Sequence, residues 1–130
     1  MDLTNPVVGL CVEGSRAEFE GRQEDARNLY WQAWELARDD YDACIAAHYV
    51  ARFQQEPNEI FHWNQTALTH ADRVQDDSAK EFYPSLYLNM GRSYELLGNH
   101  TEAKYYYDLA ARLGTEHQAQ RHSARGRFYE

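Results

Sequence analysis

The sequence predicts an all-α fold built from antiparallel helical hairpins. The first reason is that small and apolar residues recur at steps of three and four from Pro84 to Gly114, the period of an amphipathic helix. The second is that residues 7–40 repeat the same pattern. The third is composition, because 43% of the 130 residues are hydrophobic, 14% are aromatic and only three are prolines. Together these observations favour a folded helical protein over a disordered one.

The stretch from Pro84 to Gly114 contains two helices and one turn. Gly98 stands where a glycine commonly ends a helix, and Thr101 is placed to cap the next one. The short turn requires the two helices to lie antiparallel. Gly91 and Ala103 are small, so the two backbones can approach closely. Each helix then has an apolar side that needs a neighbour.

A second copy of this pattern occurs near the N-terminus. The two copies have the same mutual spacing of six residues, namely Gly14, Gly21, Ala26, Tyr30, Ala33 and Leu36 in the first and Gly91, Gly98, Ala103, Tyr107, Ala110 and Leu113 in the second. This order resembles the tetratricopeptide repeat, a helix-turn-helix unit of about 34 residues. The best copy spans residues 84–117, whereas Glu13 departs from the family's usual apolar residue. The resemblance implies a short right-handed superhelix of about seven helices.

The first two repeats are predicted to cover residues 7–40 and 41–74. Asn5 and Pro6 provide a cap and a first helical residue, so a helix is expected from about residue 6 to 20, followed by one from about 23 to 38. The middle repeat is degenerate. Gln55-Glu56-Pro57 replaces its glycine turn, and Pro57 is suited to opening the fourth helix.

The third repeat, residues 84–117, follows an insertion at residues 75–83. We expect the insertion to prolong the fourth helix, to form a short loop near residues 76–78, and to start the fifth helix early, with Pro84 in or just before its first turn. Thr115 and Gln118 match a capping box, which predicts a separate terminal helix over about residues 115–125. Such a helix covers the last hairpin of a repeat array. Residues 1–130 are predicted to form one domain.

Charge and cysteine content restrict the function. A formal net charge of −8 argues against nucleic acid as the main partner, because phosphate binding requires clustered positive charge. No apolar run approaches the roughly 20 residues of a membrane span, and the N-terminus does not resemble a secretory signal. Cys11 and Cys44 suggest no disulfide framework. These features predict a cytoplasmic protein without a membrane segment.

The resemblance implies that the first helix of each hairpin lines a concave groove for a peptide or a partner segment. Transferred to this sequence, the groove positions include Val8, Val12, Ser15, Phe19, Tyr49, Arg52, Phe53, Asn89, Arg92 and Glu95. Arg52, Asn89 and Arg92 are the expected polar anchors for a peptide backbone or carboxylate. The expected function is therefore a non-enzymatic protein-interaction module without a cofactor or metal.

Several alternatives remain open at this stage. No nucleophile, base and orienting group share a supporting spacing, so no catalytic residue is expected. Glu59 and His62 match one Glu-x-x-His element of a helical-bundle metalloprotein, an architecture that requires two such elements. The apolar groove positions are also compatible with self-association, including a homodimer, or with a peptide-sensing regulatory domain. Trp31 either contacts a partner or packs against a neighbouring long helix.

Overall fold

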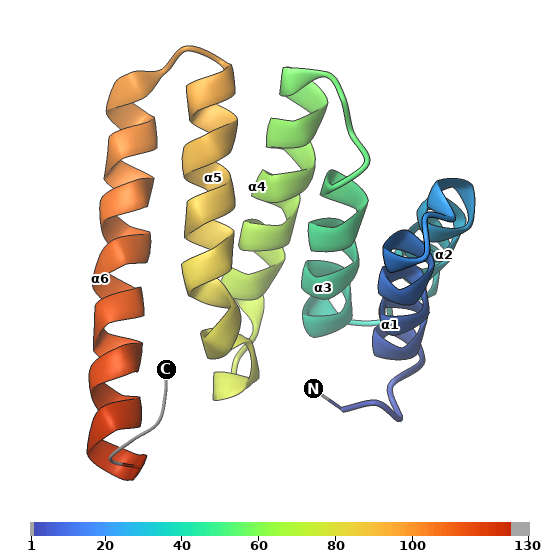
Figure 1. The fold of residues 1–130 in the computed structure, drawn as a ribbon, viewed down its shortest axis with the longest axis horizontal. Coiled ribbons are helices and arrows are strands. Elements are labelled where there is room, and N and C mark those ends of the chain that lie inside the picture. Colours follow the sequence, from blue (N-terminus) through green and yellow to red (C-terminus); the bar gives the residue numbers. More distant parts are fainter. Residues whose placement is uncertain (1, 126–130) are drawn as a thin grey trace. The chain divides into compact units, whose positions relative to one another are not determined.

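The protein is all-helical throughout the part that the structure describes, as the sequence predicts. This computed structural model describes the backbone of residues 2–125 and the side chains of residues 2–114. The helices are α1 (Pro6–Phe19), α2 (Gln23–Leu36), α3 (Asp40–Ala51), α4 (Pro57–Arg73), the short 3₁₀ helix η1 (Asp77–Phe82), α5 (Tyr83–Leu96) and α6 (His100–Arg125) (Figure 1).

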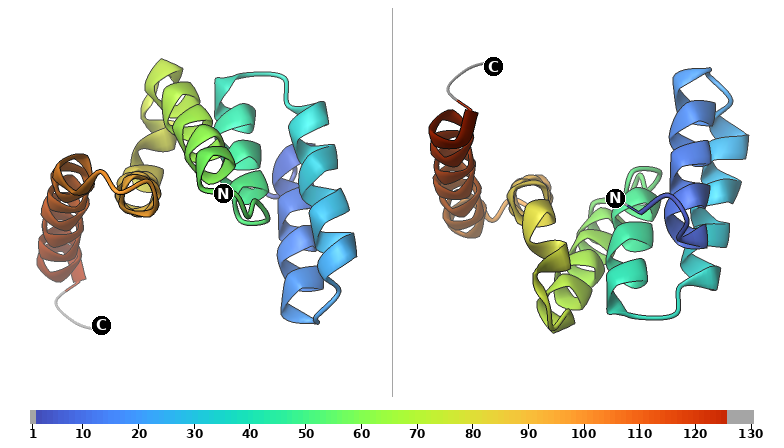
Figure 2. Two further views of the ribbon diagram at one scale, coloured as in Figure 1. Left: turned by 90° about the horizontal axis from the view of Figure 1, so that it is seen from above. Right: turned by 90° about the horizontal axis from the view of Figure 1, so that it is seen from below.

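The chain divides into two compact units between Ala79 and Lys80. In the first unit α1 packs against α2, α3 packs against α4, and α3 also contacts both α1 and α2 (Figure 2). In the second unit α5 and α6 form one antiparallel hairpin (Figure 1). The stacking of all three hairpins into one superhelix stays a prediction.

The α1–α2 hairpin forms as its sequence predicts. The Asn5 side chain accepts hydrogen bonds from the backbone N–H groups of Val7 at 2.8 Å and Val8 at 3.4 Å, which satisfies two donors at the start of α1. Gly21 has a φ of +81°, a left-handed conformation that glycine adopts without a steric penalty. Gly14 lies against the ring of Tyr30, so α1 and α2 approach closely at this point.

A buried aspartate joins the first three helices. Asp42 is fully buried, and one of its carboxylate oxygens accepts a hydrogen bond of 2.8 Å from the Asn5 side chain. Its other oxygen accepts from the backbone N–H of Arg38 at 3.2 Å, while the Asp42 N–H donates to the Asp39 side chain at 2.8 Å. The start of α1, the end of α2 and the start of α3 are therefore held by one hydrogen-bonded carboxylate.

Aromatic side chains connect α2 to α4. Trp63 of α4 lies edge-on to Trp31, with ring centroids 5.3 Å apart, and edge-on to Trp34 at 5.0 Å. Both values fall in the range preferred by aromatic pairs. Trp31 therefore packs against the long neighbouring helix, the second of its two predicted roles, and it remains 38% exposed.

The α5–α6 hairpin repeats the geometry of α1–α2. Gly98 has the same φ of +81° as Gly21, and Gly91 lies against the ring of Tyr107 as Gly14 does against Tyr30. The prediction of Thr101 as the helix cap is wrong. α6 already begins at His100, and the Asn99 side chain accepts a hydrogen bond from the backbone N–H of Glu102. Asparagine is at least as good a cap as threonine, and this one stands two residues earlier.

The insertion does not lengthen the fourth helix. α4 ends at Arg73, and Val74 adopts an extended conformation with a ψ of 124°. The Asp76 side chain then accepts hydrogen bonds from the backbone N–H and the hydroxyl of Ser78, at 2.9 and 2.6 Å. This local aspartate turn competes with continued helix and leads into η1. Pro84 lies in the first turn of α5, as predicted.

The predicted separate helix over residues 115–125 is also wrong. α6 continues through Gly114 to Arg125, so the described residues contain six α-helices instead of about seven. One glycine inside a helix costs about 1 kcal/mol relative to alanine. Ending one helix and nucleating another costs more, because several dihedral angles must be fixed before the first new hydrogen bond forms. Gly114 is therefore accommodated in the helix.

Candidate partner-binding surface

The structure places the predicted groove residues in both compact units. Seven of them lie in the first unit, on α1 and at the end of α3: Val8, Val12, Ser15, Phe19, Tyr49, Arg52 and Phe53. The remaining three, Asn89, Arg92 and Glu95, lie on α5 in the second unit. Val8 is fully buried and belongs to the core of the first unit. Val8 is therefore not available to a partner in this structure.

Without Val8 and Arg52, the first set forms what we call the α1–α3 surface, made of the exposed Val12 and Phe19 and the half-buried Ser15, Tyr49 and Phe53. Val12, Ser15 and Phe19 recur at three and four residues along α1, so they share one side of the helix. Phe19 is 93% exposed and Val12 is 38% exposed. A nearly fully exposed phenylalanine at the end of a helix leaves a large apolar side chain in water.

Tyr30 of α2 lies beneath this surface and holds its aromatic residues in place. The Tyr30 ring stacks on Tyr49, with centroids 5.0 Å apart, and lies tilted against Phe53 at 5.6 Å. The Arg27 guanidinium lies 5.6 Å from the centroid of the Phe53 ring, within the range of a cation–π contact. Tyr49 and Phe53 are consequently fixed by packing and are not loose surface side chains.

Arg52 is committed to an ion pair inside the unit. Its guanidinium donates two hydrogen bonds to the Glu18 carboxylate, at 3.2 and 2.5 Å, and the Tyr30 hydroxyl donates a third at 2.8 Å. The bonds from Arg52 and then from Tyr30 lower the pKa of Glu18. Burial, followed by the contact with Glu18, raises the pKa of Tyr30 to about 12. Arg52 therefore braces α3 against α1, which differs from the predicted anchor for a ligand carboxylate.

Sequence reasoning missed Glu18 and Tyr30 as members of this site. Glu18 and Arg52 are 34 residues apart, the length predicted for one repeat, and each lies at the C-terminal end of the first helix of its hairpin. Opposite charges at equivalent repeat positions were the signal that could have identified the pair.

Glu95 has a comparable partner in the second unit. The Tyr107 hydroxyl donates a hydrogen bond of 2.6 Å to the Glu95 carboxylate. Tyr107 has its pKa raised, first by this bond and then by burial, while the charge of Arg92 acts in the opposite direction. The Asn89 backbone carbonyl accepts a hydrogen bond of 2.8 Å from the buried hydroxyl of Ser93. These contacts of Asn89 and Glu95 therefore lie within the α5–α6 hairpin.

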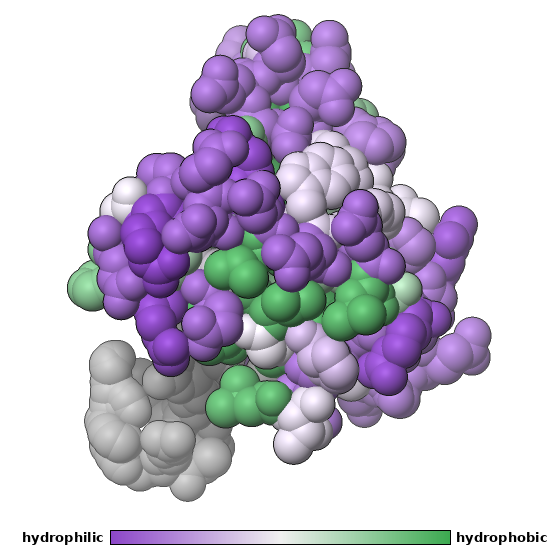
Figure 3. All heavy atoms as spheres, turned by 90° about the vertical axis from the view of Figure 1, so that its right-hand side faces the viewer, coloured by the Kyte–Doolittle hydropathy of each residue, from purple (hydrophilic) through white to green (hydrophobic). Residues whose placement is uncertain are grey.

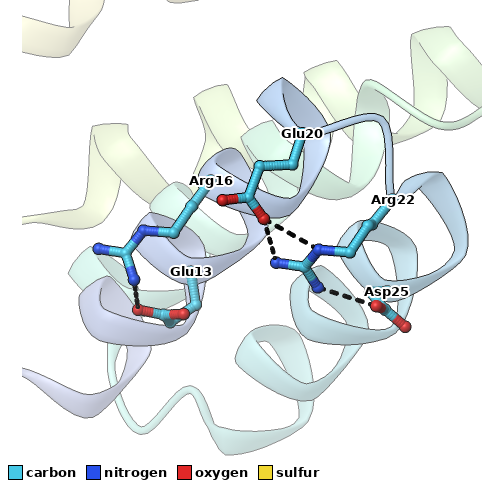
Figure 4. A network of polar contacts seen from close by, with 5 residues as sticks. All are labelled: Glu13, Arg16, Glu20, Arg22 and Asp25. Carbon is cyan, nitrogen blue, oxygen red and sulfur yellow. Dashed lines mark hydrogen bonds and ion pairs between the residues drawn. The ribbon is translucent and has the colours of Figure 1, made fainter.

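Hydrophilic side chains border the apolar positions of the α1–α2 hairpin. On the side of the molecule where α1 and α2 lie, apolar atoms form a band framed by hydrophilic ones (Figure 3). Near the turn, Arg22 bridges Glu20 and Asp25, each at 2.8 Å, and Arg16 pairs with Glu13 at 3.0 Å (Figure 4). These ion pairs are exposed, so they contribute little to stability and mainly keep the surface hydrated.

The residues considered for metal or thiol chemistry are either exposed on α4 or buried as free thiols. Glu59 and His62 both occupy exposed positions of α4, and the His62 ring contacts the neighbouring Trp63 ring at 5.3 Å. Within residues 2–114, no three side chains of His, Cys, Asp or Glu gather closely enough to hold a metal ion. Cys11 and Cys44 are buried and unbridged, and burial raises the pKa of each thiol to about 12.

Comparisons with protein-family models, with curated proteins and with solved structures find no match to this chain. Among the described helices, none combines the length and the apolar character needed to cross a membrane.

Proposed function

We propose that this protein is a non-enzymatic interaction module of the tetratricopeptide type, and that it binds a peptide segment of a partner protein on the α1–α3 surface. The observation that carries the proposal is Phe19, which is 93% exposed and lies on the same side of α1 as the partly exposed Val12. Aromatic residues, phenylalanine among them, are enriched in protein–protein interfaces.

The repeated hairpin geometry supports the repeat-type assignment. Both hairpins have a glycine packed on a tyrosine ring, a turn glycine with a φ of +81°, and a tyrosine hydroxyl bonded to a glutamate twelve residues earlier. Glycine is required at the first position because a Cβ atom there would collide with the ring. Shared constraints at equivalent positions favour one repeating unit over two unrelated hairpins.

The chemistry of the surface favours an apolar or aromatic side chain as the main ligand group. Phe19 and Val12 offer apolar area, whereas the charges of Arg52 and Glu18 already satisfy each other. A ligand carboxylate on Arg52 would have to displace Glu18 and leave it near the Tyr30 hydroxyl without its cation. We therefore expect affinity to depend on burial of apolar area, with a weak dependence on salt.

Paired charge substitutions test this proposal. The variant Val12→Glu/Phe19→Glu alters two exposed side chains of the surface, and Leu36→Glu alters an exposed leucine of α2 as a matched control. Affinity capture from the source organism's lysate, analysed by mass spectrometry, is expected to recover a partner with the wild type and with Leu36→Glu but not with the double variant.

The purified partner is then expected to bind the wild type and Leu36→Glu with similar affinity and to bind the double variant more weakly. Equal capture by all three folded proteins would contradict the proposal. Recovery of the chain alone, with a dimer in sedimentation analysis that the double variant abolishes, would assign the α1–α3 surface to self-association instead.

A further inference from the structure

The two glycine–tyrosine hairpins differ in what covers them. In the first hairpin, Tyr30 and its partner Glu18 are covered by residues 40–54, which comprise α3 and the three residues after it. Tyr49 stacks on Tyr30 at 5.0 Å, and Arg52 pairs with Glu18. As a result Tyr30 is only 1% exposed. The first hairpin thus shows what kind of helix fits against this arrangement of side chains.

The equivalent side chains of the second hairpin remain accessible. Glu95 is exposed and Tyr107 is half-buried. Among the residues described with side chains, no lysine or arginine pairs with Glu95 and no aromatic ring stacks on Tyr107. The helix expected to turn back over this hairpin does not do so, because α6 continues unbroken to Arg125.

We propose that this Glu95–Tyr107 surface binds a helix of a partner protein, and that this helix carries an aromatic residue followed three residues later by an arginine. Tyr49 and Arg52 have this spacing in the segment that covers the first hairpin. Residues three apart lie on the same side of a helix, so one helix can stack its ring on Tyr107 and place its guanidinium on Glu95. The Glu95 carboxylate supplies the matching negative charge.

The residue after the packed glycine differs between the two hairpins, and this difference affects which helix the Glu95–Tyr107 surface can bind. Ser15 follows the first glycine, and its hydroxyl lies 3.4 Å from that of Tyr30, whereas Arg92 follows the equivalent glycine of α5. Arg92 is exposed and its charge acts on Tyr107. It therefore repels an arginine that approaches Glu95, and it selects for a partner helix with an acidic side chain nearby. The inference does not depend on the α1–α3 surface, which lies in the other unit.

The protein supplies its own probe for this surface. We would use a synthetic peptide of residues 40–54 with Cys44→Ala, held helical by a covalent staple between positions 43 and 47. At 100° per residue these two positions lie on the opposite side of the helix from Tyr49 and Arg52. The staple removes the cost of ordering a short helix, which would otherwise obscure binding. Full-length ¹⁵N-labelled protein reports the binding site through its amide signals.

We expect the peptide to shift the amide signals around Glu95, Gly98 and Tyr107. The substitution Arg52→Gln in the peptide should weaken binding about tenfold, because one charge-assisted pair is lost. Glu95→Gln in the protein should weaken it by about the same factor, and the two changes together should cost little more than either alone. Arg92→Ser should tighten binding, because it removes the like charge. Glu18→Gln is the matched control and should leave the peptide affinity within about twofold.

Other results would overturn the inference. These are the absence of any shift at millimolar peptide, equal affinity for the Arg52→Gln peptide, and shifts confined to the surroundings of Glu18 and Tyr30, which would mean that the peptide only displaces α3. A concentration-dependent dimer of the wild type that Glu95→Arg abolishes would identify a second copy of this chain as the occupant and would also overturn it.

Discussion

At the scale of single residues, the closest approach of two helices depends on a missing side chain. A Cβ atom built on Gly14 would lie 2.7 Å from Cδ1 of the Tyr30 ring, and one built on Gly91 would lie 2.7 Å from the Tyr107 ring. Tyr30 is fixed by stacking and hydrogen bonding, so it cannot move aside without breaking the contacts with Tyr49 and Glu18. The glycine is therefore required for packing and not for backbone conformation.

The two glycines of α1 should respond oppositely to alanine. Gly14→Ala is expected to destabilise the protein by about 1–3 kcal/mol through overpacking against Tyr30. Gly9→Ala in the same helix is expected to stabilise it by about 0.5–1 kcal/mol, because nothing lies within 4 Å of the added atom and alanine favours helix. Urea unfolding followed by circular dichroism measures both. Equal effects of the two substitutions would show that α1 and α2 do not meet at Gly14.

The buried carboxylate of Asp42 is a second residue with a large expected effect. Asp42→Ala removes the acceptor for the Asn5 side chain and for the Arg38 N–H in a fully buried position. A loss of about 2–4 kcal/mol is expected, because buried donors are left unsatisfied. Asp108→Ala is the matched control, since the pair that Asp108 forms with Lys104 is exposed. That substitution should change the free energy of unfolding by less than about 0.5 kcal/mol.

Sequence reasoning identified small residues more successfully than polar partners. Gly14, Gly91, Gly21 and Gly98 could be predicted, since the repeat fixes their spacing and glycine has few other reasons to recur. Asp42, Glu18 and the capping role of Asn99 could not. A carboxylate or amide in the sequence gives no indication of its burial, because its partners come from other helices.

At the scale of the elements, local competition decided each boundary that sequence reasoning missed. The starts of α1, α2 and α4 and the turns at Gly21 and Gly98 were predicted correctly, because each has a cap, a proline or a glycine of its own. The loop after α4 depended on the Asp76–Ser78 turn, which competes with helix at similar energy. After Gly114, the capping-box pattern of Thr115 and Gln118 predicted the start of a new helix, but α6 continues through these residues.

Substitution of Gly114 distinguishes a helix interior from a helix end. Gly114→Ala is expected to raise helical content slightly and to stabilise α6 by about 1 kcal/mol, because the residue lies inside the helix with nothing within 4 Å of the added Cβ. Gly98→Ala, at a φ of +81°, is expected to destabilise the protein by about 1 kcal/mol. Thermal melts of both variants measure the difference. Destabilisation by Gly114→Ala would indicate instead that α6 ends at Gly114.

At the scale of the whole molecule, three buried groups with a strongly raised pKa reduce the stability at alkaline pH. The pKa values of Cys11 and Cys44 rise from 9.0 to about 12, and that of Tyr30 rises from 10.0 to about 12. Burial disfavours the thiolate and phenolate forms in the folded state. The unfolded chain therefore releases these protons at lower pH than the folded chain. The stability that they contribute is fully present below about pH 9 and is lost as pH rises towards 12.

We accordingly expect the free energy of unfolding to fall steadily above about pH 9, as measured by urea titrations at successive pH values. Cys11→Ala/Cys44→Ala should reduce the slope between about pH 9 and 10, because two of the three ionisations are removed. The wild-type thiols should also react slowly with thiol reagents until the protein unfolds. Rapid modification of the native protein, or an unchanged slope in the double variant, would contradict this assignment.

The clustering of Trp31, Trp34 and Trp63 has an optical consequence. These are all three tryptophans of the chain, and they lie in the first compact unit. Fluorescence excited at tryptophan wavelengths therefore follows the unfolding of α1–α4 alone, whereas far-ultraviolet ellipticity follows every helix. The separation between the two melting curves measures the cooperativity between the units without any added dye.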